Sequence, residues 1–80
     1  MDRTKLVIRC MSERLREEMT QYLSANYDDP LKFASLGYAN AAGFVLDLLE
    51  NTETGYHFKT IEKELADEKN KTKSANTSQN

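Results

Sequence analysis

Residues that cross-link a small fold or interrupt its helices are scarce: the 80 residues include one cysteine, one proline and three glycines. Tryptophan is absent. Cys10 cannot form a disulfide within the chain, which argues against a disulfide-rich secreted scaffold and favours a small buried hydrophobe in a reducing compartment. No apolar run approaches the ~18 residues that a membrane-spanning helix needs. The first residues do not resemble a secretory signal. We therefore expect a cytoplasmic protein with no membrane partner.

The residues that usually carry catalysis or bind metals are equally sparse. His57 is the only histidine, and no nucleophile matches it, so we interpret it as a surface residue near the start of a helix. The acidic pair Asp28-Asp29 precedes Pro30 and fits turn chemistry better than a metal site. The sequence has no Gly-rich phosphate loop and no cluster of metal ligands. We predict that the protein is not an enzyme and has no cofactor or metal.

Charge is unevenly distributed, although the net charge is only −2. Residues 1–24 carry a net +1, residues 25–55 carry −4, and residues 56–80 carry +1. The overall acidity argues mildly against non-specific nucleic-acid binding. If the protein has a DNA-binding face, we expect it at the amino end.

Residues 4–11 are the one clear strand candidate. The segment contains the β-branched pair Val7-Ile8, and apolar positions alternate along it. No second comparable run exists, so the hydrogen bonds of this strand need a partner outside the chain. The same strand of a second copy, paired antiparallel across a two-fold axis, would supply it. The alternative is an extended N-terminal arm lying on a helical bundle.

Three helices are expected after this strand. Ser12 would cap the first, over residues 13–23, whose apolar stripe comprises Leu15, Met19, Tyr22 and Leu23. Asn40 would cap the second, over residues 41–50, which is apolar nearly all round and therefore the most buried element. The connection between them, residues 24–39, contains Pro30 and could hold a short extra helix closed by Gly37.

The third helix is expected over residues 56–69, where Phe58, Ile61 and Leu65 form a narrow apolar stripe. Residues 70–80 contain no large apolar side chain, so we predict a disordered tail. A folded part of about 65 residues is of the size at which oligomerisation often supplies missing core.

The order of strand, capped helix, Gly-containing turn and Asn-capped helix resembles the ribbon-helix-helix superfamily of DNA-binding proteins. The residues that carry the resemblance lie in segments 5–15 and 37–45, including Gly37-Tyr38-Ala39-Asn40 before the second helix. The resemblance implies a mainly α fold with one N-terminal strand, in which two subunits form an antiparallel ribbon. Residues 1–55 would form this domain, with an unusually long connection at 24–39, and residues 56–69 would add a third helix.

The resemblance also implies site residues, because the ribbon of this family enters the DNA major groove. Lys5, Val7 and Arg9 would face the bases. Arg3, Asn40 and Ala41 would contact phosphates, the latter two at the amino end of the second helix. The expected dimer core comprises Leu6, Ile8, Cys10, Leu15, Met19, Phe44, Val45, Leu48 and Leu49.

Two functions follow as hypotheses. The first is a homodimeric, sequence-specific regulator of transcription, such as a repressor, that binds double-stranded DNA and is of the kind carried by viral and plasmid genomes. The second is a protein-interaction module, such as an antitoxin or a viral effector, whose residues 56–80 bind a protein partner.

Overall fold

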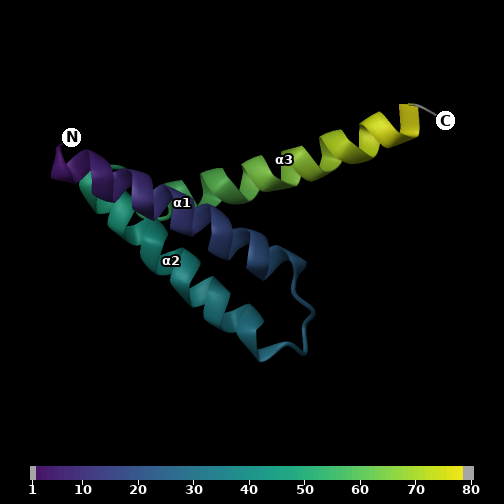
Figure 1. The fold of residues 1–80 in the computed structure, drawn as a ribbon, viewed down its shortest axis with the longest axis horizontal. Coiled ribbons are helices and arrows are strands. Elements are labelled where there is room, and N and C mark those ends of the chain that lie inside the picture. The colour runs from purple at the N-terminus through teal and green to yellow at the C-terminus, as the bar shows by residue number, and fades with distance from the viewer. Residues whose placement is uncertain (1, 79–80) are drawn as a thin grey trace.

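Three helices make up the structure, a computed structural model that describes residues 2–78 and the side chains of residues 2–69. Helix α1 spans Arg3–Ser24, α2 spans Pro30–Glu50 and α3 spans Tyr56–Ser78. Helices α1 and α2 lie side by side as an antiparallel hairpin, closed by residues 25–29 (Figure 1). Helix α3 starts at the opposite end of the hairpin, runs back in the direction of α1, and diverges from it (Figure 1).

The predicted fold class is wrong. Residues 2–78 contain no strand, and the segment 4–11 that was expected to form the intersubunit ribbon is the first half of α1. A ribbon-helix-helix fold requires that N-terminal strand, so neither the ribbon nor this fold describes the protein.

The reason lies in how the apolar residues of α1 line up. Ile8, Met11, Leu15 and Met19 recur at intervals of three and four residues, so one continuous helix puts all four on the side that faces α2. As a strand, the segment would separate Ile8 from Met11 and would leave its backbone groups without partners in the chain. The helix satisfies those groups internally. The strand preference of Val7 and Ile8 is weak by comparison, because such preferences depend on context.

The start of α1 also differs from the prediction. The Asp2 carboxylate accepts a hydrogen bond from the backbone N–H of Thr4 at 3.2 Å and caps the helix there. Ser12, the predicted cap, lies in the helix interior. Capping by Asp2 begins α1 ten residues earlier than Ser12 would.

Helix α2 includes most of the predicted 24–39 connection. Asp29 caps it by accepting a 2.9 Å hydrogen bond from the N–H of Leu31, and Pro30 occupies the first turn, where its missing N–H costs nothing. Gly37 and Asn40, the predicted turn and cap, lie within the helix. The helix ends at Asn51, which adopts a left-handed conformation with φ 55°.

The core is small and lies mainly between the two helices of the hairpin. Its fully buried apolar residues are Leu15, Met19, Ala39, Ala42 and Leu46. Helix α3 contributes Phe58, Ile61 and Leu65, which are partly buried against this cluster. Gly43 lies where α3 packs against α2: a Cβ added there would be 3.4 Å from the backbone nitrogen of Phe58.

Lys32 ties the closed end of the hairpin together. Its ammonium group donates to the carbonyl oxygens of Tyr22 at 2.7 Å and Ala25 at 2.9 Å, the last turn of α1 and the residue after it. The same group lies 4.6 Å from the ring centroid of Tyr22. The only basic residue between positions 25 and 55 therefore helps to stabilise the fold.

The third helix begins at Tyr56, as expected, and its apolar stripe packs inward. Its bounds continue to Ser78. The side chains of residues 70–78, and residues 79 and 80 altogether, lie outside the described part of the chain. The predicted disordered tail falls there and stays a prediction.

Candidate protein-interaction surface

Helix α2 has an apolar stripe beside its core-facing side, about 100° around the helix from the buried residues. It consists of Ala34, Tyr38, Ala41, Val45 and Leu48, spaced four and three residues apart, and is called the outer stripe below. Tyr38 is 57% exposed and Leu48 is 66% exposed, whereas Val45 is half-buried. No charged residue interrupts the stripe over its length. A solvent-facing helix side usually carries charged or polar residues, so this stripe resembles a contact surface.

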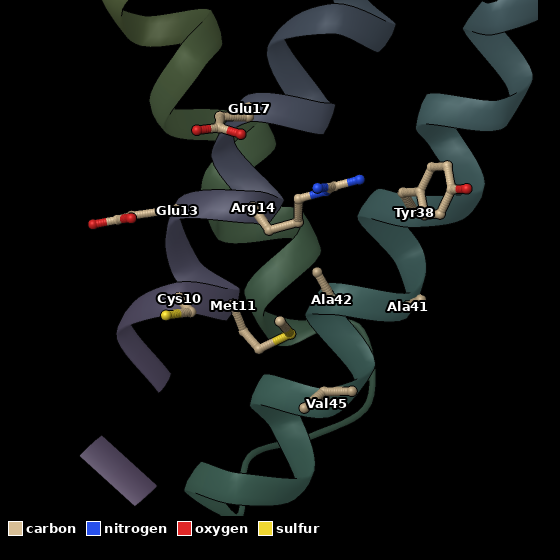
Figure 2. Close-up of a pocket in the computed structure, with 9 residues that line it drawn as sticks. All are labelled: Cys10, Met11, Glu13, Arg14, Glu17, Tyr38, Ala41, Ala42 and Val45. Atoms are coloured by element: carbon tan, nitrogen blue, oxygen red, sulfur yellow. The ribbon is translucent and has the colours of Figure 1, made fainter. Parts of the chain in front are cut away.

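A groove of about 510 Å³ runs between the outer stripe and α1. Figure 2 shows its lining residues, with Met11 reaching from α1 between the helices and Val45 on the α2 side. Cys10 contributes to the α1 wall and is exposed. Close to this wall, Val7 and Leu6 are also exposed. The amino half of α1 and the carboxyl half of α2 thus form one apolar end of the hairpin.

Charged residues border the groove only on the α1 side. The Arg14 guanidinium extends toward α2 and lies 5.3 Å from the ring centroid of Tyr38, a cation–π arrangement visible in Figure 2. Arg14 also pairs with Glu18 at 3.2 Å. Glu13 points away from the groove floor (Figure 2). The floor, formed by Met11, alanines and Val45, is therefore free of charge.

The residues predicted to contact DNA bases do not share one face. Lys5 and Arg9 are one turn apart on α1, but Val7 lies about 200° around the helix from Lys5. Arg9 also pairs with Glu13 at 3.6 Å, with both side chains well exposed. The alternation that put all three residues on one side applies to a strand, and a helix separates them.

The residues predicted to contact phosphates do not lie together at the amino end of a helix either. Asn40 and Ala41 lie in the middle of α2, where backbone N–H groups are used within the helix and do not point at a ligand. Arg3 is at the first turn of α1 and is exposed. The amino end of α2 is at Pro30, at the other end of the hairpin from Arg3.

The predicted dimer core divides into two groups. Leu15 and Met19 are fully buried within the chain, and Ile8 packs against them. The remaining residues, apart from the half-buried Val45, are exposed: Leu6, Cys10, Phe44, Leu48 and Leu49. Val45 and Leu48 belong to the outer stripe, so the sequence had picked out part of this surface.

A polar cluster at the junction of α2 and α3 was not predicted from the sequence. Asp47 is 3% exposed, and its carboxylate accepts hydrogen bonds from the backbone N–H groups of Gly55 at 2.8 Å and His57 at 3.2 Å. It also accepts one from the Thr52 hydroxyl at 2.9 Å. The Nδ1 atom of His57 lies 2.6 Å from this carboxylate, and its Nε2 lies 3.1 Å from Glu50. The cluster anchors the start of α3.

These contacts determine the ionisation of Asp47. Burial by itself raises the pKa of this carboxyl, but hydrogen bonds from the His57 side chain, the Gly55 backbone, Thr52 and the His57 backbone lower it to about 2. Asp47 is thus a carboxylate at neutral pH. Its partners lie five, eight and ten residues away in the sequence, spacings that give no periodic signal, which is why the pattern of the sequence did not reveal the cluster.

One side of α3 is joined to α1 by ion pairs. Glu64 and Glu68 both bind Arg16 of α1, at 3.1 and 2.6 Å, with all three side chains partly exposed. Phe58, Ile61 and Leu65 of α3 are turned toward the hairpin, whereas Tyr56 is exposed. Over residues 56–69, then, α3 uses its apolar side within the chain and does not present it to a partner.

No group of residues able to hold a metal ion occurs among the described side chains. Nor does any described helix combine the length and apolar character needed to cross a membrane. The chain matches no family model, no curated protein and no solved structure.

Proposed function

We propose that the protein is a protein-interaction module whose docking surface is the outer stripe of α2 together with the adjoining groove. One observation carries the proposal: an uncharged stripe is largely exposed along α2, about 100° around the helix from the residues that form the core. A structural helix gains nothing from exposing Tyr38 and Leu48, because apolar side chains stabilise the fold only where water is removed. If the groove binds the apolar face of a partner helix, the residues of the outer stripe would contact that partner.

The proposed binding surface lies on the α1–α2 hairpin, whereas the sequence had favoured residues 56–80. The described part of α3 has its apolar stripe packed against the hairpin and pairs Glu64 and Glu68 with Arg16, so among the described residues it lacks a continuous uncovered apolar face. The hairpin has one. Regulation of transcription through a β-ribbon is not proposed, since residues 4–11 are helical.

Ala41→Glu tests the proposal, because Ala41 is exposed at the middle of the outer stripe and lines the groove. Phe33→Glu is the matched control: it introduces the same charge at an exposed apolar position of α2 that lies outside the stripe. The assay is copurification from cells, followed by titration of the purified partner by calorimetry.

We expect the wild type and Phe33→Glu to bind the same partner and Ala41→Glu to lose it. Equal partner binding by Ala41→Glu would contradict the proposal. A titration with genomic DNA fragments at two salt concentrations should show no specific binding. Specific DNA binding that survives Ala41→Glu would also overturn it.

A further inference from the structure

The ring of His57 lies between two carboxylates at the start of α3. Its Nδ1 is 2.6 Å from the buried carboxylate of Asp47, and its Nε2 is 3.1 Å from that of Glu50. Both acids belong to the last turn of α2 and lie three residues apart, on the same side of the helix. The ring is only 15% exposed, so water screens these contacts less than it screens a surface ion pair. One imidazole ring therefore joins the end of α2 to the start of α3.

The two carboxylates have no other cation beside them. Within the described part of the chain, neither Asp47 nor Glu50 forms an ion pair with a lysine or an arginine. The other side chains at the ring are the phenol of Tyr56, edge-on with centroids 5.2 Å apart, and the hydroxyl of Thr52. From α1, no described residue forms a hydrogen bond or an ion pair with the ring. Two negative charges thus converge on one ring that can carry a positive charge.

Only the protonated ring can donate to both carboxylates. A neutral imidazole has one N–H group, whereas an imidazolium has two. If the neutral ring keeps its proton on Nδ1, it still donates to Asp47, but the lone pair of Nε2 then faces the carboxylate of Glu50. The Thr52 hydroxyl, 3.3 Å from Nδ1, does not replace the lost proton, because it has a single hydrogen and Asp47 is its nearer acceptor at 2.9 Å. Deprotonation of the ring therefore breaks the contact with Glu50.

The position of His57 decides what this contact holds in place. The next residue, Phe58, packs against the core, and its backbone nitrogen lies beside Gly43 of α2. Further along, α3 is attached by two partly buried apolar side chains and by the partly exposed ion pairs of Arg16, and ion pairs of that kind contribute little. The first turn of α3 is thus the part whose attachment to α2 depends most on the ring.

We infer that His57 acts as a pH-dependent bridge between α2 and α3. The protonated ring donates to Asp47 and Glu50 together and holds the first turn of α3 on the hairpin. When the ring releases its proton to water, Glu50 loses its donor and that turn is held less firmly. The bridge is therefore complete at mildly acidic pH and is lost as the pH rises through the titration of the ring.

The carboxylate of Asp47 does not titrate in the same range. Its pKa is about 2, so it stays ionised over the whole interval in which a histidine changes charge. A response of α3 between about pH 5 and about pH 8 thus reports on the ring. The bridge shares no residue with the outer stripe or the groove, so this inference goes beyond the proposed function and does not rest on it.

Hydrogen exchange measured by NMR on the full chain tests the inference. His57 is the only histidine, so its ring signals follow the titration without ambiguity. The backbone N–H groups of His57 and Lys59 donate to Asp47 and to the Gly55 carbonyl, and their exchange, corrected for its intrinsic pH dependence, reports opening of the first turn. We expect this opening to increase at least about threefold as the ring loses its proton.

Glu50→Gln tests whether the bridge causes the response, because glutamine keeps the length of the side chain and removes its charge. Glu53→Gln is the matched control: it removes the same charge from an exposed acid of the 51–55 connection that has no ion pair among the described residues. We expect the pH response to fall to less than about half in Glu50→Gln and to be unchanged in Glu53→Gln. His57→Gln should abolish it. Circular dichroism checks that each variant is helical.

A wild-type opening that stays constant while the ring titrates would overturn the inference, as would a turn held more firmly at alkaline pH. Equal pH responses in the wild type, Glu50→Gln and Glu53→Gln would also overturn it, even if His57→Gln were too unstable to measure. None of these results bears on partner binding at the outer stripe, because Ala41→Glu leaves every residue of the bridge in place.

Discussion

The core-facing side and the outer stripe of α2 differ in how far their side chains are buried. The inner side packs Ala39, Ala42 and Leu46 against α1, and even its carboxylate, Asp47, has a hydrogen-bond donor for each oxygen. The outer stripe leaves Tyr38 and Leu48 more than half exposed to water. The inner side therefore accounts for folding of the chain. The outer side has the composition of a surface that is completed by another molecule.

Truncating one leucine on each side should give the largest contrast. Leu46→Ala removes a fully buried side chain from the core and should cost about 2–5 kcal/mol of unfolding free energy. Leu48→Ala, two residues along, should change it by less than about 0.5 kcal/mol in the monomer. Urea denaturation at low protein concentration measures both. Equal losses would mean that the outer side also stabilises the monomer.

Breaking the polar cluster should produce the next largest effect. Asp47→Ala leaves the N–H groups of Gly55 and His57 and the Thr52 hydroxyl without their acceptor, so the melting temperature should fall clearly. Glu50→Ala is the control, because Glu50 is partly exposed and contacts only the outer nitrogen of the His57 ring. Hydrogen exchange should show the first turn of α3 opening in Asp47→Ala. Protection of that turn at wild-type level would contradict the anchoring role.

Acid should lower the free energy of unfolding, because protonation of the Asp47 carboxylate weakens its hydrogen bonds. The pKa of Asp47 is about 2 in the folded protein against an ordinary value of 3.8, so the unfolded state binds more protons between these values. The contribution of Asp47 to stability is therefore present above about pH 4 and is lost as the pH falls toward 2. Thermal melts across this range should show a smaller acid loss in Asp47→Asn. An identical pH profile for the variant would show that other carboxyls dominate.

Two glycines of α2 provide the smallest and most local test. Gly37 has no heavy atom within 4 Å of an added Cβ, so Gly37→Ala should stabilise the helix by up to about 1 kcal/mol. Gly43→Ala should gain less, because its Cβ would meet Phe58 at 3.4 Å. Chemical denaturation of the two variants compares them. A larger gain at Gly43 would show that α3 is free to move away from α2.

Much of the helical part could be predicted from the sequence. The stripes at 13–23 and 56–69 repeat at the helical period and contain the residues that pack inward, such as Leu15 and Leu65. The expectation that Val45 and Leu48 lie at a dimer interface stays a prediction. What failed was segment 4–11, where alternation over a few residues favoured a strand. The helical register of Ile8 and Met11 with Leu15 was the competing signal, and it continues over a longer stretch.

The sequence by itself determined three amphipathic segments, the small size of the core and the absence of a disulfide within the chain. It could not determine which side of α2 faces water, because that helix is apolar nearly all round and its pattern fits either orientation. Only packing against α1 and α3 decided it: Leu46 joins the core, Gly43 lies against Phe58 of α3, and most of the outer stripe stays exposed together with Phe33, Phe44 and Leu49. The hydrogen bonds of Asp47 likewise depend on the chain folding back at residues 51–55, since no local rule of sequence brings those groups together.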